Sequence, residues 1–429
     1  MLSILKTNTA TTQCIILSIV ALVIFSIPVS AQEAIASTEY NAYQENTSNN
    51  GLFNAGDLKL HGFVALGVID VNGSDFVNDD GSLSTELTEI GFNASWQLDS
   101  QFRLAGQVVY LDGGNRYEKG VRVDYALIDW SAIATENWQL NVYAGRSKNN
   151  HWLYSSTRTV PFARPSIILP QSVYFDGFRD IAVGHDGAGL KLSHSNDDYG
   201  NFDFNLTYGR SPISDEQEEI LLSQLATGKA KQEFDLQSSF YWQPAFSQWR
   251  FGLSLLDSDF SYESARPEKP DAFFDAEFSF QFYTFNALYE GEFWEFSGEI
   301  YQSRFETTGF YFPQHHTDNI AQGYYLQTRY KLTPDLTLLA RYEDFYLNKE
   351  DKDGKKLEED SMGLIPAYFG YHKDTVLGLS YDFTSNLSLR LEYHWVQGAG
   401  RLTPVVVPNP RKNDSEDWQL WAAQLMYWF

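Results

Sequence analysis

Apolar and polar residues alternate along the chain from about Leu58 onward, in stretches of roughly ten residues. Between Gln101 and Tyr110, one face collects the apolar residues Phe102, Leu104, Val108 and Tyr110, and the other collects Arg103, Ala105 and Gln107. Late in the chain, the apolar residues Leu387, Leu389, Leu391, Tyr393 and Trp395 oppose Ser388, Arg390, Glu392 and His394. A period of two puts alternate side chains on opposite faces of a β-strand. Strands are therefore predicted to dominate the chain.

Sixteen such segments are predicted, an even number, as single-chain bacterial barrels have. They lie near 58–70, 84–97, 101–111, 120–132, 137–146, 187–195, 201–210, 231–243, 247–258, 273–289, 292–303, 321–332, 335–347, 372–383, 387–397 and 417–429. Many exceed the five or six residues of an average soluble strand. They suit a tilted membrane crossing of about nine to eleven residues.

The connections alternate between tight turns and long polar loops, as in a barrel with one short-turn rim and one long-loop rim. The tight turns are Leu98-Asp99-Ser100, Pro244-Ala245-Phe246, Thr333-Pro334 and Thr384-Ser385-Asn386. Tryptophans near segment ends indicate aromatic girdles at the two membrane interfaces, namely Trp138, Trp242, Trp249, Trp294 and Trp395. We expect an all-β protein, a transmembrane antiparallel β-barrel of about 16 strands over 58–429.

The N-terminus has the pattern of a secretory signal peptide. Lys6 precedes the apolar run 14–27, and small residues follow up to Ala31. This run is shorter than the roughly 20 residues of a membrane-spanning helix. We predict a signal peptide over 1–31 and a flexible periplasmic segment over 32–57. Cleavage would remove Cys14, the only cysteine, and with it any disulfide or thiolate metal site.

Composition removes several classes of protein. A net charge of -25 and a pI near 4.6 argue against a nucleic-acid partner, which would require a basic surface. Mean hydropathy is -0.34, and no apolar run after the signal is long enough for a helical membrane protein. Aromatic residues make up 16% of the chain, which suits a sheet with one lipid-facing side and one watery side.

The chain ends Leu425-Met426-Tyr427-Trp428-Phe429, with alternate residues apolar back to Trp421. This ending resembles the C-terminal signature of Gram-negative outer-membrane barrels. The resemblance implies that the barrel-assembly machinery reads Phe429.

The longest loop, about 147–186, is also the third long one, and in the general porins the third external loop folds into the barrel. The porin resemblance further implies an outer-membrane location, contact with lipid and lipopolysaccharide, and a homotrimer.

A sixteen-strand barrel encloses a lumen too wide to discriminate among solutes, so a constriction is needed. The loop 147–186 is expected to supply it, stiffened by three prolines. Its charged residues are the candidate pore constriction: Arg158, Arg164, Arg179, Asp176 and Asp180. A mobile surface loop remains the alternative.

Further charged residues fall on the inferred lumen wall: Arg103, Arg122, Arg329, Arg341, Arg390, Glu295 and Glu299. Acidic residues outnumber basic ones on that face, which favours a weak preference for cations. Arginines at the narrowest point of the pore would reverse this preference for cations. For any single arginine, an ion pair that stabilises the wall is the alternative.

The expected function is passive diffusion of small hydrophilic solutes through a water-filled channel. Two alternatives remain: a channel specific for sugar, phosphate or peptide, and a structural or adhesive barrel. For a sugar channel, Tyr283, Tyr289 and Tyr301 are assigned to the inner face. Catalysis is not expected, because no Gly-x-Ser-x-Gly motif accompanies the histidines. No cofactor is implied, and no metal site is assigned. The acidic residues within 350–360 could take Ca²⁺ that bridges to lipopolysaccharide, but their spacing differs from that of an EF-hand. A short external helix is indicated within 211–229.

Overall fold

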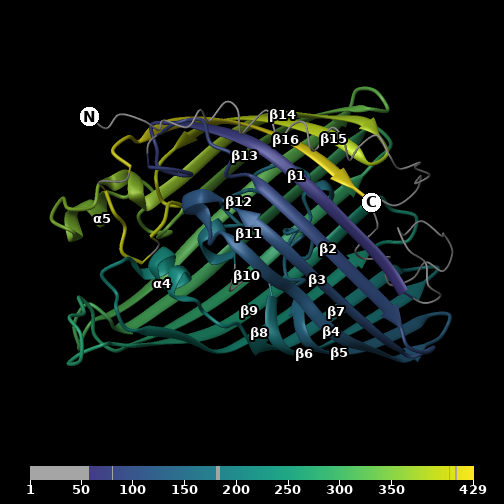
Figure 1. The fold of residues 1–429 in the computed structure, drawn as a ribbon, viewed down its shortest axis with the longest axis horizontal. Coiled ribbons are helices and arrows are strands. Elements are labelled where there is room, and N and C mark those ends of the chain that lie inside the picture. Colours follow the sequence, from purple (N-terminus) through teal and green to yellow (C-terminus); the bar gives the residue numbers. More distant parts are fainter. Residues whose placement is uncertain (1–57, 80, 180–183, 405, 411–412) are drawn as a thin grey trace, which may run out of the picture. The chain divides into compact units, whose positions relative to one another are not determined.

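The computed structural model describes residues 58–429 except 80, 180–183, 405 and 411–412. The predicted signal peptide, 1–31, and the predicted segment 32–57 lie outside the described residues. Sixteen antiparallel strands form one closed barrel in which each strand pairs with its neighbours in sequence and β1 pairs with β16 (Figure 1). The predicted transmembrane-type barrel of about 16 strands is thus confirmed as the fold.

The strands lie close to their predicted bounds. They are β1 (Leu58–Asn72), β2 (Thr88–Gln97), β3 (Phe102–Asp112), β4 (Gly120–Ala134), β5 (Trp138–Lys148), β6 (Gly184–Asn196), β7 (Gly200–Arg210), β8 (Lys229–Gln243), β9 (Trp249–Glu263), β10 (Ala276–Glu290), β11 (Trp294–Gly309), β12 (His316–Lys331), β13 (Leu336–Tyr346), β14 (Tyr371–Thr384), β15 (Leu387–Gln397) and β16 (Asp417–Trp428). The helices are η1 (Gly114–Arg116), η2 (Pro161–Ala163), η3 (Asp176–Phe178), α4 (Asp215–Leu222), α5 (Lys355–Asp360) and η4 (Ala367–Gly370).

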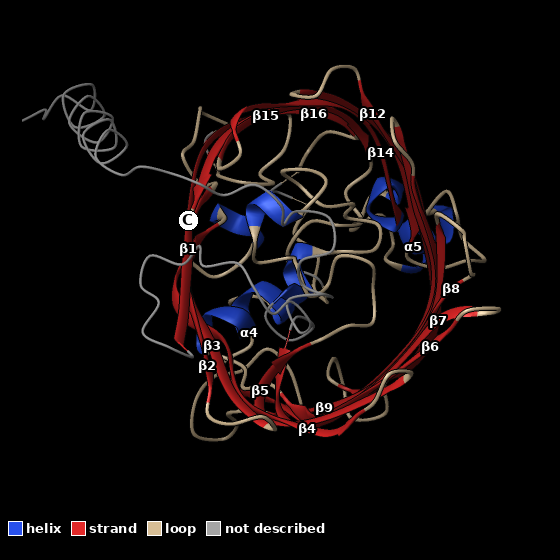
Figure 2. Cartoon of the chain, turned by 90° about the vertical axis from the view of Figure 1, so that its right-hand side faces the viewer, coloured by secondary structure: helices blue, strands red, loops and turns tan. Residues whose placement is uncertain are grey.

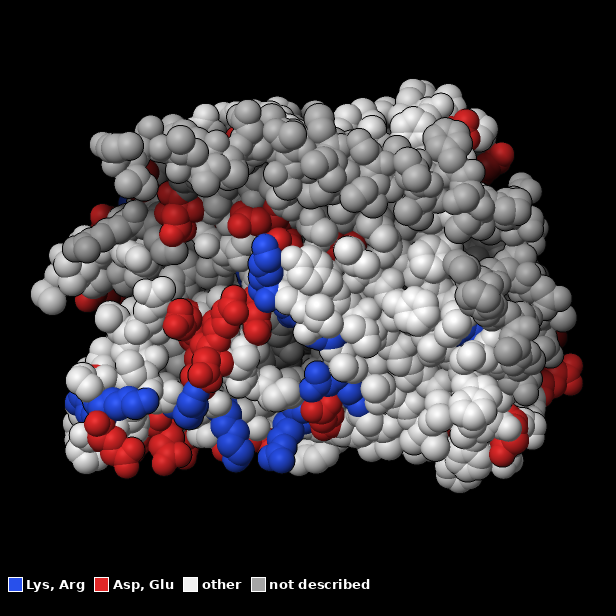
Figure 3. Space-filling model, viewed as in Figure 1, with Lys and Arg blue, Asp and Glu red and all other residues white. Residues whose placement is uncertain are grey.

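The alternation of side chains separates an inner wall from an outer wall. Tyr325 is fully buried on the inner wall, whereas the next residue, Leu326, is 64% exposed on the outer wall. Leu326 pairs in register with Tyr342, which is also exposed, so the apolar positions continue from strand to strand. Figure 3 shows charged side chains concentrated toward the end that carries α4 and α5 in Figure 1. The pattern fits a barrel whose outer wall faces lipid.

The predicted girdle tryptophans lie on the outer wall, each between 38% and 46% exposed. At the short-turn end, aromatic rings stack from strand to strand, as Phe202 does with Trp242. Trp294 and Tyr330 continue this row, with ring centroids 4.4 Å apart. Rings that combine an apolar body with a polar edge suit a membrane interface.

The last residue completes the barrel. The backbone of Phe429 exchanges two hydrogen bonds of 3.0 Å with Gly62 of β1. A Cβ at Gly62 would lie 2.6 Å from the ring of Phe429, so a larger residue at this position would displace that ring. The C-terminal residue is therefore part of the closing seam, while its reading by an assembly machinery stays a prediction.

The helices lie in the long loops. The predicted short helix within 211–229 is confirmed as α4, whose N-terminus is capped by Ser214 through a hydrogen bond from the backbone of Gln217. The short helix α5, in the acidic loop, was not predicted. Among the described residues, no helix is long and apolar enough to cross a membrane.

Candidate pore constriction

The long connection between β5 and β6 folds into the barrel. Its described part, residues 149–179, is called the inserted loop below, and nearly all of its side chains are buried. In the end-on view of Figure 2, loops and short helices occupy the inside of the ring of strands. The prediction of an in-folded third loop is confirmed, and a mobile surface loop is excluded for these residues.

The start of the inserted loop is fixed to β10 and β11. The indole nitrogen of Trp152 donates a hydrogen bond of 3.1 Å to the hydroxyl of Thr284. The backbone N–H of Leu153 donates to a carboxylate oxygen of Glu299 at 3.1 Å, and the phenol of Tyr174 donates to its other oxygen. A buried carboxylate that accepts several hydrogen bonds holds its donors in place. Glu299 therefore fixes two separate points of the loop to β11.

The middle of the inserted loop is fixed to β13 and β15. Glu343 accepts the backbone N–H of Ser172 at 2.6 Å, and Glu392 accepts that of Ile167 at 2.5 Å. In the reverse direction, Arg341 donates to the carbonyl of Ile168 at 3.0 Å. Loop backbone groups that would be unsatisfied inside the barrel thus find charged partners on the wall.

The wall leaves room for this contact at Gly323 of β12. A Cβ there would stand 2.5 Å from the ring of Tyr301 and 3.0 Å from the carbonyl oxygen of Ser172. The absence of a side chain at Gly323 therefore lets the inserted loop approach the wall closely.

Four arginines and two carboxylates form a buried group, called the arginine cluster: Arg116, Arg158, Arg164, Arg179, Asp176 and Glu89. The shortest ion pairs are Arg164 with Glu89, at 2.7 Å, and Arg158 with Asp176, at 3.0 Å. Arg179 stands 3.8 Å from both Glu89 and Asp176. The guanidinium carbon of Arg179 also lies 4.4 Å from the ring centroid of Tyr117. Within the cluster, positive charge exceeds negative charge.

Two loop side chains have pKa values set by this environment. Burial alone raises the pKa of Asp176, but Arg116, Arg158 and Arg179 outweigh burial and hold that pKa below its ordinary value. Burial lowers the pKa of His151 to about 3, and the positive charge of Arg158 adds to the effect. At neutral pH, Asp176 is therefore ionised and His151 is neutral.

The predicted constriction residues are brought together, but not as side chains facing open water. Arg158, Arg164 and Arg179 are each only 2% to 4% exposed and are paired with Asp176 or Glu89. Their role in a constriction stays a prediction. Asp180 lies outside the described residues.

The predicted lumen-wall residues lie in three places. Glu299, Arg341 and Arg390 fix the inserted loop, the last through a 2.9 Å hydrogen bond to the carbonyl of Pro161. Nearer the short turns, the side chains of Arg103, Arg329 and Glu295 are 16% to 24% exposed, and Arg329 pairs with Glu295 at 2.8 Å. Near the long loops, Arg122 donates to the carbonyl of Glu118.

One assignment was wrong. Tyr283 is 52% exposed on the outer wall, and the ring of Tyr289 packs at a tilt against the exposed Trp249, so both lie outside, unlike Tyr301. The reason is that β10 has aromatic residues at both even and odd positions, so the sequence does not show which set faces inward. Glu89, Arg116 and Arg401 were missed. The alternation of inward and outward side chains along β2 would have placed Glu89 on the inner wall. The two arginines lie in loops, where no alternation indicates which way a side chain points.

A second loop, the described part of 398–416, crosses the long-loop mouth. Arg401 donates to the carbonyl of Ser172 at 2.8 Å, and the backbone N–H of Val406 donates to the carbonyl of Leu221 at 2.9 Å. The Thr403 hydroxyl donates to the carbonyl of Asn115 at 3.0 Å. This mouth loop therefore joins the inserted loop to two other loops, which contain Leu221 and Asn115.

No protein-family model matches the chain, and no curated protein matches its sequence significantly. Solved structures do match. OmpT of Vibrio cholerae in a trimer form aligns at 12% identity with a TM-score of 0.52, covering 87% of this chain and 99% of that one. An anion-selective porin from Comamonas acidovorans has 12% identity and a TM-score of 0.54, with 87% and 99% covered. Salmonella typhi OmpF with daunomycin has 12% identity and a TM-score of 0.55, with 88% and 99% covered.

At this level of identity the likeness concerns the fold alone. It extends over nearly the full length of each matched chain. The chain has the porin-like barrel fold that its ending and its third long loop indicated.

Proposed function

We propose that the protein is an outer-membrane channel through which small hydrophilic solutes and ions diffuse passively. The observation that carries the proposal is the inserted loop, which charged wall residues hold inside a closed barrel. A polar inner wall can carry water, and an apolar outer wall suits lipid. The proposal assigns the barrel no catalytic activity.

The arginine cluster supports a preference for anions in the narrow part. The cluster groups Arg116, Arg158, Arg164 and Arg179 with two carboxylates, Asp176 and Glu89. Although these side chains are buried, their field acts on an ion that passes nearby, because a low-dielectric wall screens charge poorly. This local field opposes the cation preference expected from the acidic residues of the whole inner wall. The proposal gives priority to the cluster because selectivity is set where a pore is narrowest.

The mouth loop favours a second candidate, a channel that opens only for certain solutes. Its hydrogen bonds to the inserted loop and to α4 support this candidate, because they connect the mouth loop to two other long connections at the same end of the barrel. A protein of this kind would conduct little in the described conformation and more after the mouth loop is shortened.

Single-channel recording of the refolded mature protein in a planar bilayer tests both candidates. Stepwise conductance, with swelling of liposomes in small sugars, is expected for passive diffusion. A silent wild type that conducts after residues 400–410 are replaced by a short Gly-Ser linker would favour the second candidate. If both forms fold and stay silent, the channel proposal is wrong and a structural barrel becomes the better interpretation.

The proposal includes a homotrimer in contact with outer-membrane lipid and lipopolysaccharide, and assembly through Phe429. One support for the trimer is that a structure of Vibrio cholerae OmpT is described as a trimer form. Sedimentation in detergent is expected to give three chains per particle. Removal of Phe429 is expected to lower the amount of assembled barrel in the outer membrane, whereas Phe429→Tyr, which keeps a terminal ring, is expected to retain most of it.

A further inference from the structure

Two carboxylates lie directly opposite each other inside the barrel. Glu343 of β13 and Asp374 of β14 are partners in register, and both are at least 97% buried. Like charges in this position repel each other. A buried pair of this kind requires positive charge close by.

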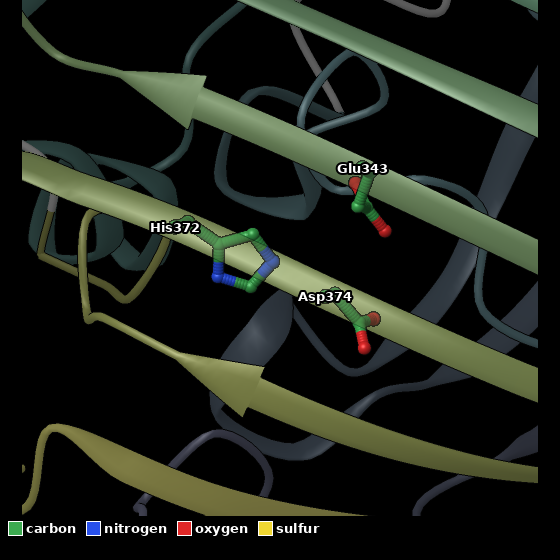
Figure 4. A group of neighbouring side chains, drawn as sticks. All are labelled: Glu343, His372 and Asp374. Carbon is green, nitrogen blue, oxygen red and sulfur yellow. The ribbon is translucent and has the colours of Figure 1, made fainter. Parts of the chain in front are cut away.

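His372 lies two residues before Asp374 on the same inner face of β14. It is 98% buried, and neither of its ring nitrogens has a hydrogen-bond partner among the described residues. A buried imidazole without partners loses the hydrogen bonds that water would give it. Figure 4 shows its ring beside Glu343 and Asp374, and ligand atoms of the three residues lie within 4.8 Å of one another.

Each carboxylate is held by one oxygen and leaves the other without a hydrogen bond. Oε2 of Glu343 accepts the backbone N–H of Ser172, and Oδ2 of Asp374 bonds Nδ1 of His394 at 2.7 Å. Oε1 of Glu343 and Oδ1 of Asp374 have no hydrogen-bond partner among the described residues. Partners that orient a carboxylate while its second oxygen stays available are typical of metal sites.

We propose that Glu343, His372 and Asp374 form a binding site for a divalent transition-metal ion such as Zn²⁺. One imidazole nitrogen and two carboxylate oxygens suit Zn²⁺ better than Ca²⁺, which takes six to eight oxygen ligands. Tetrahedral ligands at about 2.0–2.2 Å from Zn²⁺ stand roughly 3.5 Å apart. Since the ligand atoms lie within 4.8 Å of one another, binding an ion requires them to approach by at most about 1.3 Å.

Arg341 is the competing cation. Its Nη2 lies 3.3 Å from Oε1 of Glu343 and 3.9 Å from Asp374, while Nη1 donates to the inserted loop at Ile168. An incoming ion takes over the neutralisation of the two carboxylates, while Arg341 stays bound to the loop through Nη1. Because Glu343 also holds Ser172, the ion strengthens the attachment of the inserted loop to β13.

Zinc retention by the refolded full chain tests the site. Since the ligands are buried, Zn²⁺ is added during refolding and loose metal is then removed with a weak chelator. The adjacent surface histidines are first removed in a His315→Ala/His316→Ala background. About one zinc per chain is expected in this background by elemental analysis, and less than a tenth of that after His372→Ala or His372→Gln is added. Co²⁺ in place of Zn²⁺ is expected to give visible absorption that the same variants abolish.

His61→Ala, at an exposed position of β1, is the matched control and is expected to keep the full zinc content. Circular dichroism confirms that each variant has folded. Equal zinc in the His372 variants and the background, or no zinc in a folded background protein, would overturn the proposal. Stoichiometric retention of Ca²⁺ would likewise contradict a transition-metal site. The readout is metal content, so it does not depend on whether the barrel conducts.

Discussion

Arg164 in the inserted loop and Glu89 on β2 form an ion pair 2.7 Å apart, with both side chains at least 97% buried and a sequence separation of 75. Arg179 approaches the same carboxylate at 3.8 Å. Glu89 therefore holds two arginines of the loop against β2, a part of the wall separate from β11 and β13.

Removing this carboxylate is predicted to release the inserted loop. Glu89→Gln leaves Arg164 buried without a counter-charge, which typically costs about 3–5 kcal/mol. A cysteine at Ser172 reports release, because Ser172 is buried and its hydroxyl has no hydrogen-bond partner among the described residues. We expect a thiol reagent to label Ser172→Cys at least tenfold faster in the Glu89→Gln protein.

The control for this experiment is Asp318→Asn, which removes one of two carboxylate partners of Arg304 in an exposed ion pair of 2.8 Å on the outer wall. Exposed pairs contribute about 0–1 kcal/mol, so labelling at Ser172→Cys should not change. Slow labelling in the Glu89→Gln protein would show that the other contacts of the inserted loop keep it docked without this ion pair.

Ion preference is predicted to depend on Arg179. Its carboxylate partners are the most distant in the arginine cluster, so Arg179→Gln removes charge with the least disturbance of the other pairs. Because positive charge falls, the reversal potential under a salt gradient should shift toward cations. Arg179→Lys keeps the charge and should keep the wild-type reversal potential. A shift in the lysine variant as large as that in the glutamine variant would instead implicate the shape of the guanidinium.

Conductance is predicted to rise when the inserted loop is shortened. Deletion of residues 158–173 removes the segment that Glu343, Glu392 and Arg390 hold across the barrel. A wider lumen carries more current, so a severalfold increase in single-channel conductance is expected. Deletion of the exposed helix α5 is the matched control and should leave conductance unchanged. The constriction hypothesis fails if the first deletion folds and conducts as the wild type does.

Acidification is predicted to loosen the inserted loop. The pKa of His151 falls from 6.5 to about 3 because the side chain is buried. A released loop would take up a proton below pH 6.5, whereas the docked loop does not until about pH 3, so docking weakens as pH falls through this window. Each unit of difference is worth about 1.4 kcal/mol. The pKa of Asp176 is lowered, so its contribution is present at neutral pH and is lost only when pH falls through that lowered value.

The measurement is the labelling rate of Ser172→Cys relative to Ser82→Cys, an exposed position, at pH 7.5 and pH 4.5. The ratio should rise at pH 4.5 in the wild-type background and rise much less with His151→Gln, which cannot titrate. An equal rise in both would assign the pH dependence to other groups.

The sixteen strands were predictable because alternation is a local property. Each strand shows it over ten or more residues, and tight turns such as Ser385-Asn386 fix where one strand ends and the next begins. Prediction was wrong for Tyr283 because β10 carries aromatic residues on both faces, so composition no longer distinguishes inside from outside.

The sequence by itself determined the barrel, its strand order and the position of its long third loop, because hydrogen bonding between neighbours in sequence leaves a meander few alternatives. Only the tertiary structure decided what that loop touches. Leu153 meets Glu299 and Ile167 meets Glu392 across separations of 146 and 225 residues, which no local pattern encodes. The same holds for Arg164 and Glu89. Glu89 was not predicted from the sequence, and these contacts exist only because the closed barrel holds the loop against strands that are distant from it in sequence.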